Sequence, residues 1–94
     1  MIYNTRAEVL IEIEPNAWHD PYDIDYLVNG WGEDNIPTND WSAEIWDDEG
    51  QMMGQLNIQY PPTNTPQGYT HINAWLDMVK SILGRFKVIR KVAR

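Results

Sequence analysis

The most regular pattern of hydrophobic residues in the chain lies between Thr70 and Gly84. Apolar side chains recur there at helical spacing and form one stripe, which consists of Ile72, Trp75, Leu76, Val79, Ile82 and Leu83. The Thr70 hydroxyl can cap the first turn by accepting a hydrogen bond from a backbone N–H, and Gly84 can end the helix in the left-handed conformation. The pattern therefore predicts an amphipathic helix against which every other element must pack.

A second pattern, strict alternation, predicts strands. In residues 6–14, one face carries Ala7, Val9, Ile11 and Ile13, whereas the other carries Glu8, Leu10, Glu12 and Glu14. That is typical of a half-buried strand, which Pro15 ends. Residues 41–46 and 51–60 predict two further strands joined in a hairpin, with Gly50 supplying the positive φ of the turn. Gly54 indicates either a bulge or a close backbone approach.

The remaining elements have weaker signals. Residues 20–30 predict a short helix with Asp20 as its N-cap, Pro21 in the first helical position and Asn29-Gly30 at its end. Residues 31–40 show no periodicity, and their glycine, proline and asparagine residues indicate a loop. Residues 85–92 predict a last strand with a bulge at Val88-Ile89.

These elements predict a single α+β domain over residues 1–94. The order β-α-β-β-α-β favours the ferredoxin-like arrangement, an antiparallel sheet with both helices on one face. The last strand would then pair with the first, so that Lys87, Arg90 and Lys91 would lie across from Glu8, Glu12 and Glu14. The alternative is a three-stranded meander with one helix, if residues 20–29 form only a loop.

Charge is distributed unevenly along the chain. Residues 1–66 carry thirteen acids and one base, Arg6, whereas residues 67–94 carry six bases and one acid, Asp77. The net charge of −7 disfavours nucleic acid or an anionic bilayer as the main partner. The chain has no cysteine, no apolar run long enough for a membrane span and no signal-peptide pattern, so we expect a cytoplasmic protein.

Catalytic and cofactor motifs are missing from the sequence. It contains no Gly-x-Ser-x-Gly, no Cys-His pair and no phosphate-binding glycine motif. His19, Asp20, Asp23 and Asp25 are suitable metal ligands, but their spacing matches neither a zinc motif nor a calcium loop. A helix cap explains Asp20 and Asp23 without a metal. We therefore expect no enzyme, no cofactor and no bound metal.

Direct binding of RNA or DNA is also disfavoured. The last predicted strand is basic, but residues 51–60 contain neither an internal aromatic residue nor a basic-Gly-aromatic motif. The glutamates of the first strand would repel phosphate.

The segment 18–49 is the strongest candidate for a functional surface. It contains four of the five tryptophans and ten acids, and it has no lysine or arginine. One interpretation is a solvated acidic rim around core aromatic residues. The other is a recognition surface, in which aromatic residues anchor a basic partner and carboxylates steer it or imitate a phosphate backbone. The candidate contacts are Trp31, Glu33, Asp34 and Asp40 in the predicted loop, and Asp47, Asp48 and Glu49 at the hairpin tip.

In general character, the small size, acidity and aromatic-acidic segment resemble phage-encoded inhibitors of host defence, which include nucleic-acid mimics and anti-CRISPR proteins. This resemblance implies an inhibitor that blocks a basic, nucleic-acid-binding surface of a host protein. Two alternatives remain open: an immunity protein that neutralises a basic toxin nuclease, and a structural or assembly subunit. The sequence leaves the oligomeric state open.

Overall fold

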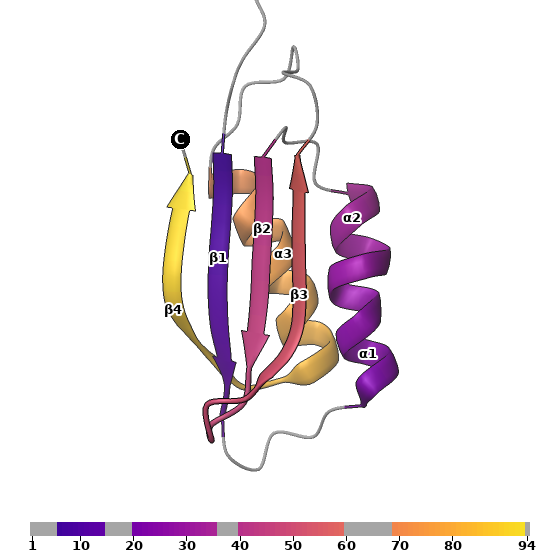
Figure 1. The fold of residues 1–94 in the computed structure, drawn as a ribbon, viewed down its shortest axis with the longest axis vertical. Coiled ribbons are helices and arrows are strands. Elements are labelled where there is room, and N and C mark those ends of the chain that lie inside the picture. Colours follow the sequence, from indigo (N-terminus) through magenta and orange to yellow (C-terminus); the bar gives the residue numbers. More distant parts are fainter. Residues whose placement is uncertain (1–5, 15–19, 36–39, 60–68, 94) are drawn as a thin grey trace, which may run out of the picture.

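A computed structural model describes residues 6–14, 20–35, 40–59 and 69–93 (Figure 1). The elements are β1 (Arg6–Ile13), α1 (Pro21–Asp25), the π-helical turn η1 (Tyr26–Gly30), α2 (Trp31–Asn35), β2 (Asp40–Trp46), β3 (Met52–Gln59), α3 (Tyr69–Leu83) and β4 (Phe86–Ala93). The first three helical elements follow one another without a break and form one helix, here called helix 21–35. The chain order β-α-β-β-α-β is thus as predicted.

The arrangement of the strands differs from the prediction. The sheet has the order β3-β2-β1-β4, and β1 runs parallel to its neighbour β2. The sheet is therefore mixed, the prediction of an antiparallel sheet is wrong, and the ferredoxin-like arrangement is not confirmed. A split β-α-β unit would separate its two parallel strands by a third strand, whereas helix 21–35 here connects direct neighbours. Hydrophobic alternation cannot distinguish the two, because it specifies which face of a strand is buried and not which strand lies beside it.

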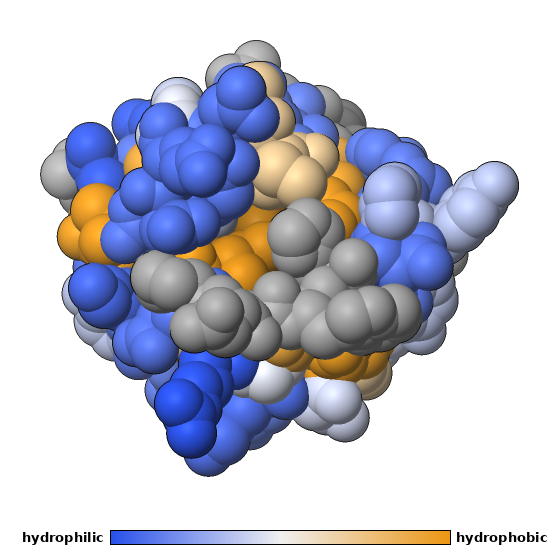
Figure 2. All heavy atoms as spheres, turned by 90° about the horizontal axis from the view of Figure 1, so that it is seen from below, coloured by the Kyte–Doolittle hydropathy of each residue, from blue (hydrophilic) through white to orange (hydrophobic). Residues whose placement is uncertain are grey.

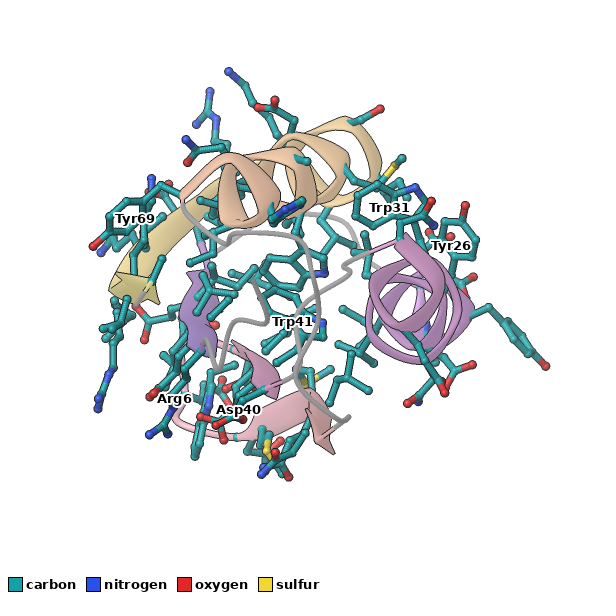
Figure 3. The ribbon with its side chains drawn as sticks, turned by 90° about the horizontal axis from the view of Figure 1, so that it is seen from above. Arg6, Tyr26, Trp31, Asp40, Trp41 and Tyr69 are labelled. Carbon is teal, nitrogen blue, oxygen red and sulfur yellow. The ribbon has the colours of Figure 1, made fainter. Side chains whose placement is uncertain are left out.

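Both helices lie on one face of the sheet, and the core fills the space between (Figures 1 and 3). The alternative of one helix on a meander is therefore wrong. The alternating apolar residues of β1 are all buried, as predicted, together with Trp41 of β2 and Trp75 of α3. These two tryptophan rings meet edge to face, with centroids 6.0 Å apart and an interplanar angle of 76°. Such pairs stabilise a core by about 0.5–1.5 kcal/mol beyond the area they bury.

The pairing of the last strand with the first is confirmed. β4 runs antiparallel to β1, and the register shifts between Leu10 and Ile11, whose partners are Arg90 and Val88. Ile89 is thus the extra residue of a bulge at the predicted place. The glycines predicted to end α3 and the hairpin turn, Gly84 and Gly50, both have positive φ.

The expected charge pairs across β1 and β4 form only in part. Arg90 pairs with Glu8 at 3.0 Å, and Lys87 lies opposite Glu12 in the register. Lys91 does not pair with a glutamate of β1. It donates a hydrogen bond to the Asn73 side chain of α3 and lies over the ring of Tyr69. The bulge separates it from the glutamate face and directs it towards the helix layer.

Helix 21–35 begins as predicted but continues further. Asp20 caps it by accepting a hydrogen bond from the Tyr22 N–H at 2.8 Å, and Pro21 occupies the first turn. The predicted end at Gly30 is wrong, and so is the loop over residues 31–35, which form α2. Residues 36–39, the rest of that predicted loop, lie outside the described residues.

Gly32, which indicates a loop in the sequence, is required by packing in the structure. The Trp75 indole N–H donates to the Leu27 carbonyl oxygen at 2.9 Å, inside the π-helical turn. A Cβ at Gly32 would lie 2.3 Å from that same oxygen and 3.3 Å from the indole nitrogen. No side chain fits there without displacing one of the two, so Gly32 permits the junction between the two helices.

We expect Gly32→Ala to lower the free energy of unfolding by about 2–4 kcal/mol, because it overpacks the junction and disrupts the buried hydrogen bond. Gly30→Ala is the matched control. The three atoms nearest to its Cβ belong to the ring of Tyr26, an exposed side chain that can move, and alanine favours a helix by about 1 kcal/mol over glycine. Urea denaturation followed by tryptophan fluorescence measures both. A Gly32→Ala protein as stable as the parent would contradict this account.

Candidate protein-binding surface

The seven residues predicted to contact a partner lie at two opposite ends of the molecule. Asp40 is the first residue of β2, and Asp47, Asp48 and Glu49 follow its last residue. A strand of seven residues spans about 20 Å, so these acids are that far apart. Trp31, Glu33 and Asp34 belong to α2, which lies near the Asp40 end in Figure 1. The predicted residues therefore do not form a single cluster.

Several of these residues already have structural roles. Trp31 is partly buried and packs against the core beside α3, where Figure 3 labels it. Asp40 lies 3.8 Å from Arg6, with the two side chains at the same corner of the sheet. The Asp47 carboxylate accepts hydrogen bonds from the N–H groups of Glu49 and Gln51, at 2.9 and 2.8 Å, and so closes the hairpin turn.

The other predicted contact residues are mostly exposed at the surface. Glu33, Asp48 and Glu49 are exposed. The side chain of Asp34 lies outside the described residues, although its backbone is part of α2. Three of the seven predicted residues are therefore exposed and available to a partner.

Two tyrosines that sequence reasoning missed stand out on helix 21–35. Tyr22 is 85% exposed and Tyr26 is 47% exposed, and Figure 3 shows Tyr26 on the side of the helix that is turned away from Trp41. Asp25, Asn29 and Glu33 are exposed on the same helix. We call these five residues the tyrosine–carboxylate face. Its signal in the sequence is the i, i+4 spacing of Tyr22 and Tyr26, offset from the buried positions of the helix.

The flank that carries this face has no positive charge from lysine or arginine. Residues 7–79 contain all fourteen acids of the chain and neither of these bases. Three of the seven bases, Lys87, Arg90 and Lys91, lie in β4, at the opposite edge of the sheet from β3 and helix 21–35 (Figure 1). The helix runs from the hairpin-tip end towards the other end over about 22 Å. The exposed carboxylates of helix 21–35 therefore lie along one side of the molecule, whereas the acidic hairpin tip lies at its lower end, below β1 (Figure 1).

The lower end of the molecule, where the hairpin tip and the start of α1 lie, mixes polar and apolar surface. Figure 2 shows blue hydrophilic side chains around the rim, with orange apolar residues visible between them. A hollow of about 660 Å³ at this end is lined by Glu14, Lys80, Gly84, Arg85 and Phe86. It contains both signs of charge, so it does not define a site for a basic partner.

A smaller groove lies beside the tyrosine–carboxylate face, between α1 and β3. Its volume is about 260 Å³, and its lining residues are Pro21, Ile24, Asp25, Val28, Asn29, Met53, Gly54 and Gln55. A Cβ at Gly54 would lie 2.6 Å from the Ile24 side chain, so the predicted close backbone approach is confirmed. The ladder between β2 and β3 also shifts register beside Gly54, where Met53 is the extra residue.

Catalytic and metal chemistry gain no support from the described residues. Asp20 is used as a helix cap, and the Asp25 carboxylate accepts a hydrogen bond from the Asn29 side chain at 2.8 Å. His19, the only imidazole of the candidate metal cluster, lies outside the described residues. Within the described ranges, no three histidine, aspartate or glutamate side chains are grouped so that they could hold a metal ion. No helix there is long and apolar enough to cross a membrane.

Comparison with known proteins gives no relative: no family model, curated protein or solved structure matches this chain.

The two aspartates of the hairpin tip should differ in their effect on stability, because Asp47 accepts hydrogen bonds within the turn and Asp48 is exposed. We expect Asp47→Ala to lower the free energy of unfolding by about 1 kcal/mol, because two backbone N–H groups lose their acceptor. Asp48→Ala, one residue away, should change it by less than about 0.5 kcal/mol, because this side chain is exposed. Urea denaturation of both variants measures the difference, and equal losses would show that Asp48 is also part of the turn.

Proposed function

We propose that the protein is a small non-catalytic inhibitor that binds a basic surface of another protein, and that this surface normally binds nucleic acid. The tyrosine–carboxylate face and the hairpin tip would make the contact. One observation carries the proposal: Tyr22 and Tyr26 are exposed beside carboxylates, on a flank that lacks lysine and arginine. Counter-defence of the anti-CRISPR or anti-restriction type is the setting that such a protein would suit.

Tyrosines and carboxylates would contribute to such binding in different ways. Exposed tyrosines provide large and rigid contact area at a low entropic cost, which is why they are common in recognition surfaces. Carboxylates accelerate encounter with a basic partner and set its orientation. Nucleic-acid-binding surfaces are basic over an extended stripe, and the acids of helix 21–35 and the hairpin tip are spread over a comparable length.

The test is capture of a partner by the immobilised protein from a nuclease-treated lysate of the proposed host, at about 0.05 M and 0.5 M salt. A partner that fits the proposal is a nucleic-acid-binding protein, is released at high salt and is displaced by added duplex DNA. For that purified partner, we expect Asp48→Lys and Tyr22→Ala each to weaken affinity about tenfold or more, because the first reverses a steering charge and the second removes an anchor.

Matched controls lie on other parts of the molecule. Asp77→Lys makes the same charge change at an exposed position of α3, and Tyr69→Ala removes another exposed tyrosine at the start of that helix. Both should leave affinity within about twofold. An affinity that is constant between low and high salt, or an equal loss with the α3 variants, would contradict the proposal.

A further inference from the structure

The groove between α1 and β3 has a chemistry that selects one type of side chain. We propose that it receives an arginine side chain of the basic partner. This inference rests on the proposed function and adds the residue type that the partner must present. It starts from two features of the groove, its apolar walls and the single charge among its lining residues.

The walls suit a long aliphatic stem. Ile24 and Val28 of helix 21–35 form one side, and Met53 of the β3 bulge contributes to the other. Ile24 and Val28 are only 3% and 1% exposed, so they present narrow apolar edges that the packing beneath holds in place, and the partly buried Met53 adds further apolar surface. Arginine and lysine both bury their methylene groups along such surfaces while their charged ends remain near water.

The polar groups favour arginine over lysine. Asp25 is the only charged lining residue, and the Asn29 side-chain N–H fixes one of its carboxylate oxygens at 2.8 Å. Asn29 adds a side-chain amide oxygen that can accept a hydrogen bond. A planar guanidinium presents five donors to such a set of acceptors and is weakly hydrated, whereas an ammonium loses more hydration next to apolar walls.

The size of the groove agrees with a single side chain. Its volume of about 260 Å³ is below the 300–1,000 Å³ or so that is typical of small-molecule sites. Its acid, Asp25, also belongs to the tyrosine–carboxylate face, so one partner surface can place an arginine in the groove while it contacts Tyr22 and Tyr26. The occupant is therefore part of a protein partner and not a separate ligand.

The test uses N-acetyl-arginine N-methylamide as a probe, titrated into the ¹⁵N-labelled protein and followed by NMR. We expect saturable shifts of the Gly54 and Gln55 backbone amides and of the Asn29 side-chain amide. The citrulline analogue, which has the same shape without the charge, should cause none, and the lysine analogue should bind more weakly. Asp25→Asn should weaken binding of the arginine probe about fivefold, whereas Asp77→Asn on α3 should not change it.

Three results would each overturn the inference: shifts spread over all acidic residues without saturation, equal or tighter binding of the lysine analogue, and unchanged binding by Asp25→Asn. The amide spectrum of each variant shows directly whether it is folded. None of these results affects the proposed function, whose failure would appear as salt-independent capture of a partner or as equal losses with the α3 variants.

Discussion

The buried hydrogen bond from the Trp75 indole N–H to the Leu27 carbonyl is the contact on which the arrangement of the helices depends. It joins two residues that are 48 positions apart and fixes α3 against the middle of helix 21–35. The π-helical turn and Gly32 leave room for it, and the same indole ring meets Trp41 of β2 edge to face. A buried indole N–H without an acceptor would cost about 1–3 kcal/mol. One side chain therefore positions both helices relative to the sheet.

The proposed function uses the opposite side of the same helix. Ile24, Leu27 and Val28 are buried on its inner side, whereas Tyr22 and Tyr26 are exposed. Because the inner side is fixed by the core, the backbone that carries the exposed tyrosines and carboxylates is held in place before a partner arrives. Surfaces organised in this way lose less conformational entropy on binding. The core that stabilises the protein is thus also the support for the candidate binding surface.

Features that depend on local periodicity could be predicted from the sequence. The alternation in β1, the stripe of α3, the hairpin and the bulge in β4 all follow from spacing within a single segment. The parallel pairing of β1 with β2 depends on a choice between neighbours that no single segment encodes. The helix beyond Gly30 was missed for a related reason: Gly32 is there to make room for Trp75, a residue more than forty positions later. The acidity of the candidate surface was visible in the sequence, whereas its division between two ends and its exposed tyrosines required the structure.

Native-state hydrogen exchange on Trp75→Phe tests most directly whether the indole hydrogen bond holds helix 21–35 in place. Phenylalanine keeps an aromatic ring in the core but cannot donate to Leu27. The account predicts that amides of helix 21–35 lose protection by about tenfold relative to those shared by β1 and β4, because the helix opens separately from the sheet. Unchanged protection of helix 21–35, or an equal loss in every element, would contradict it.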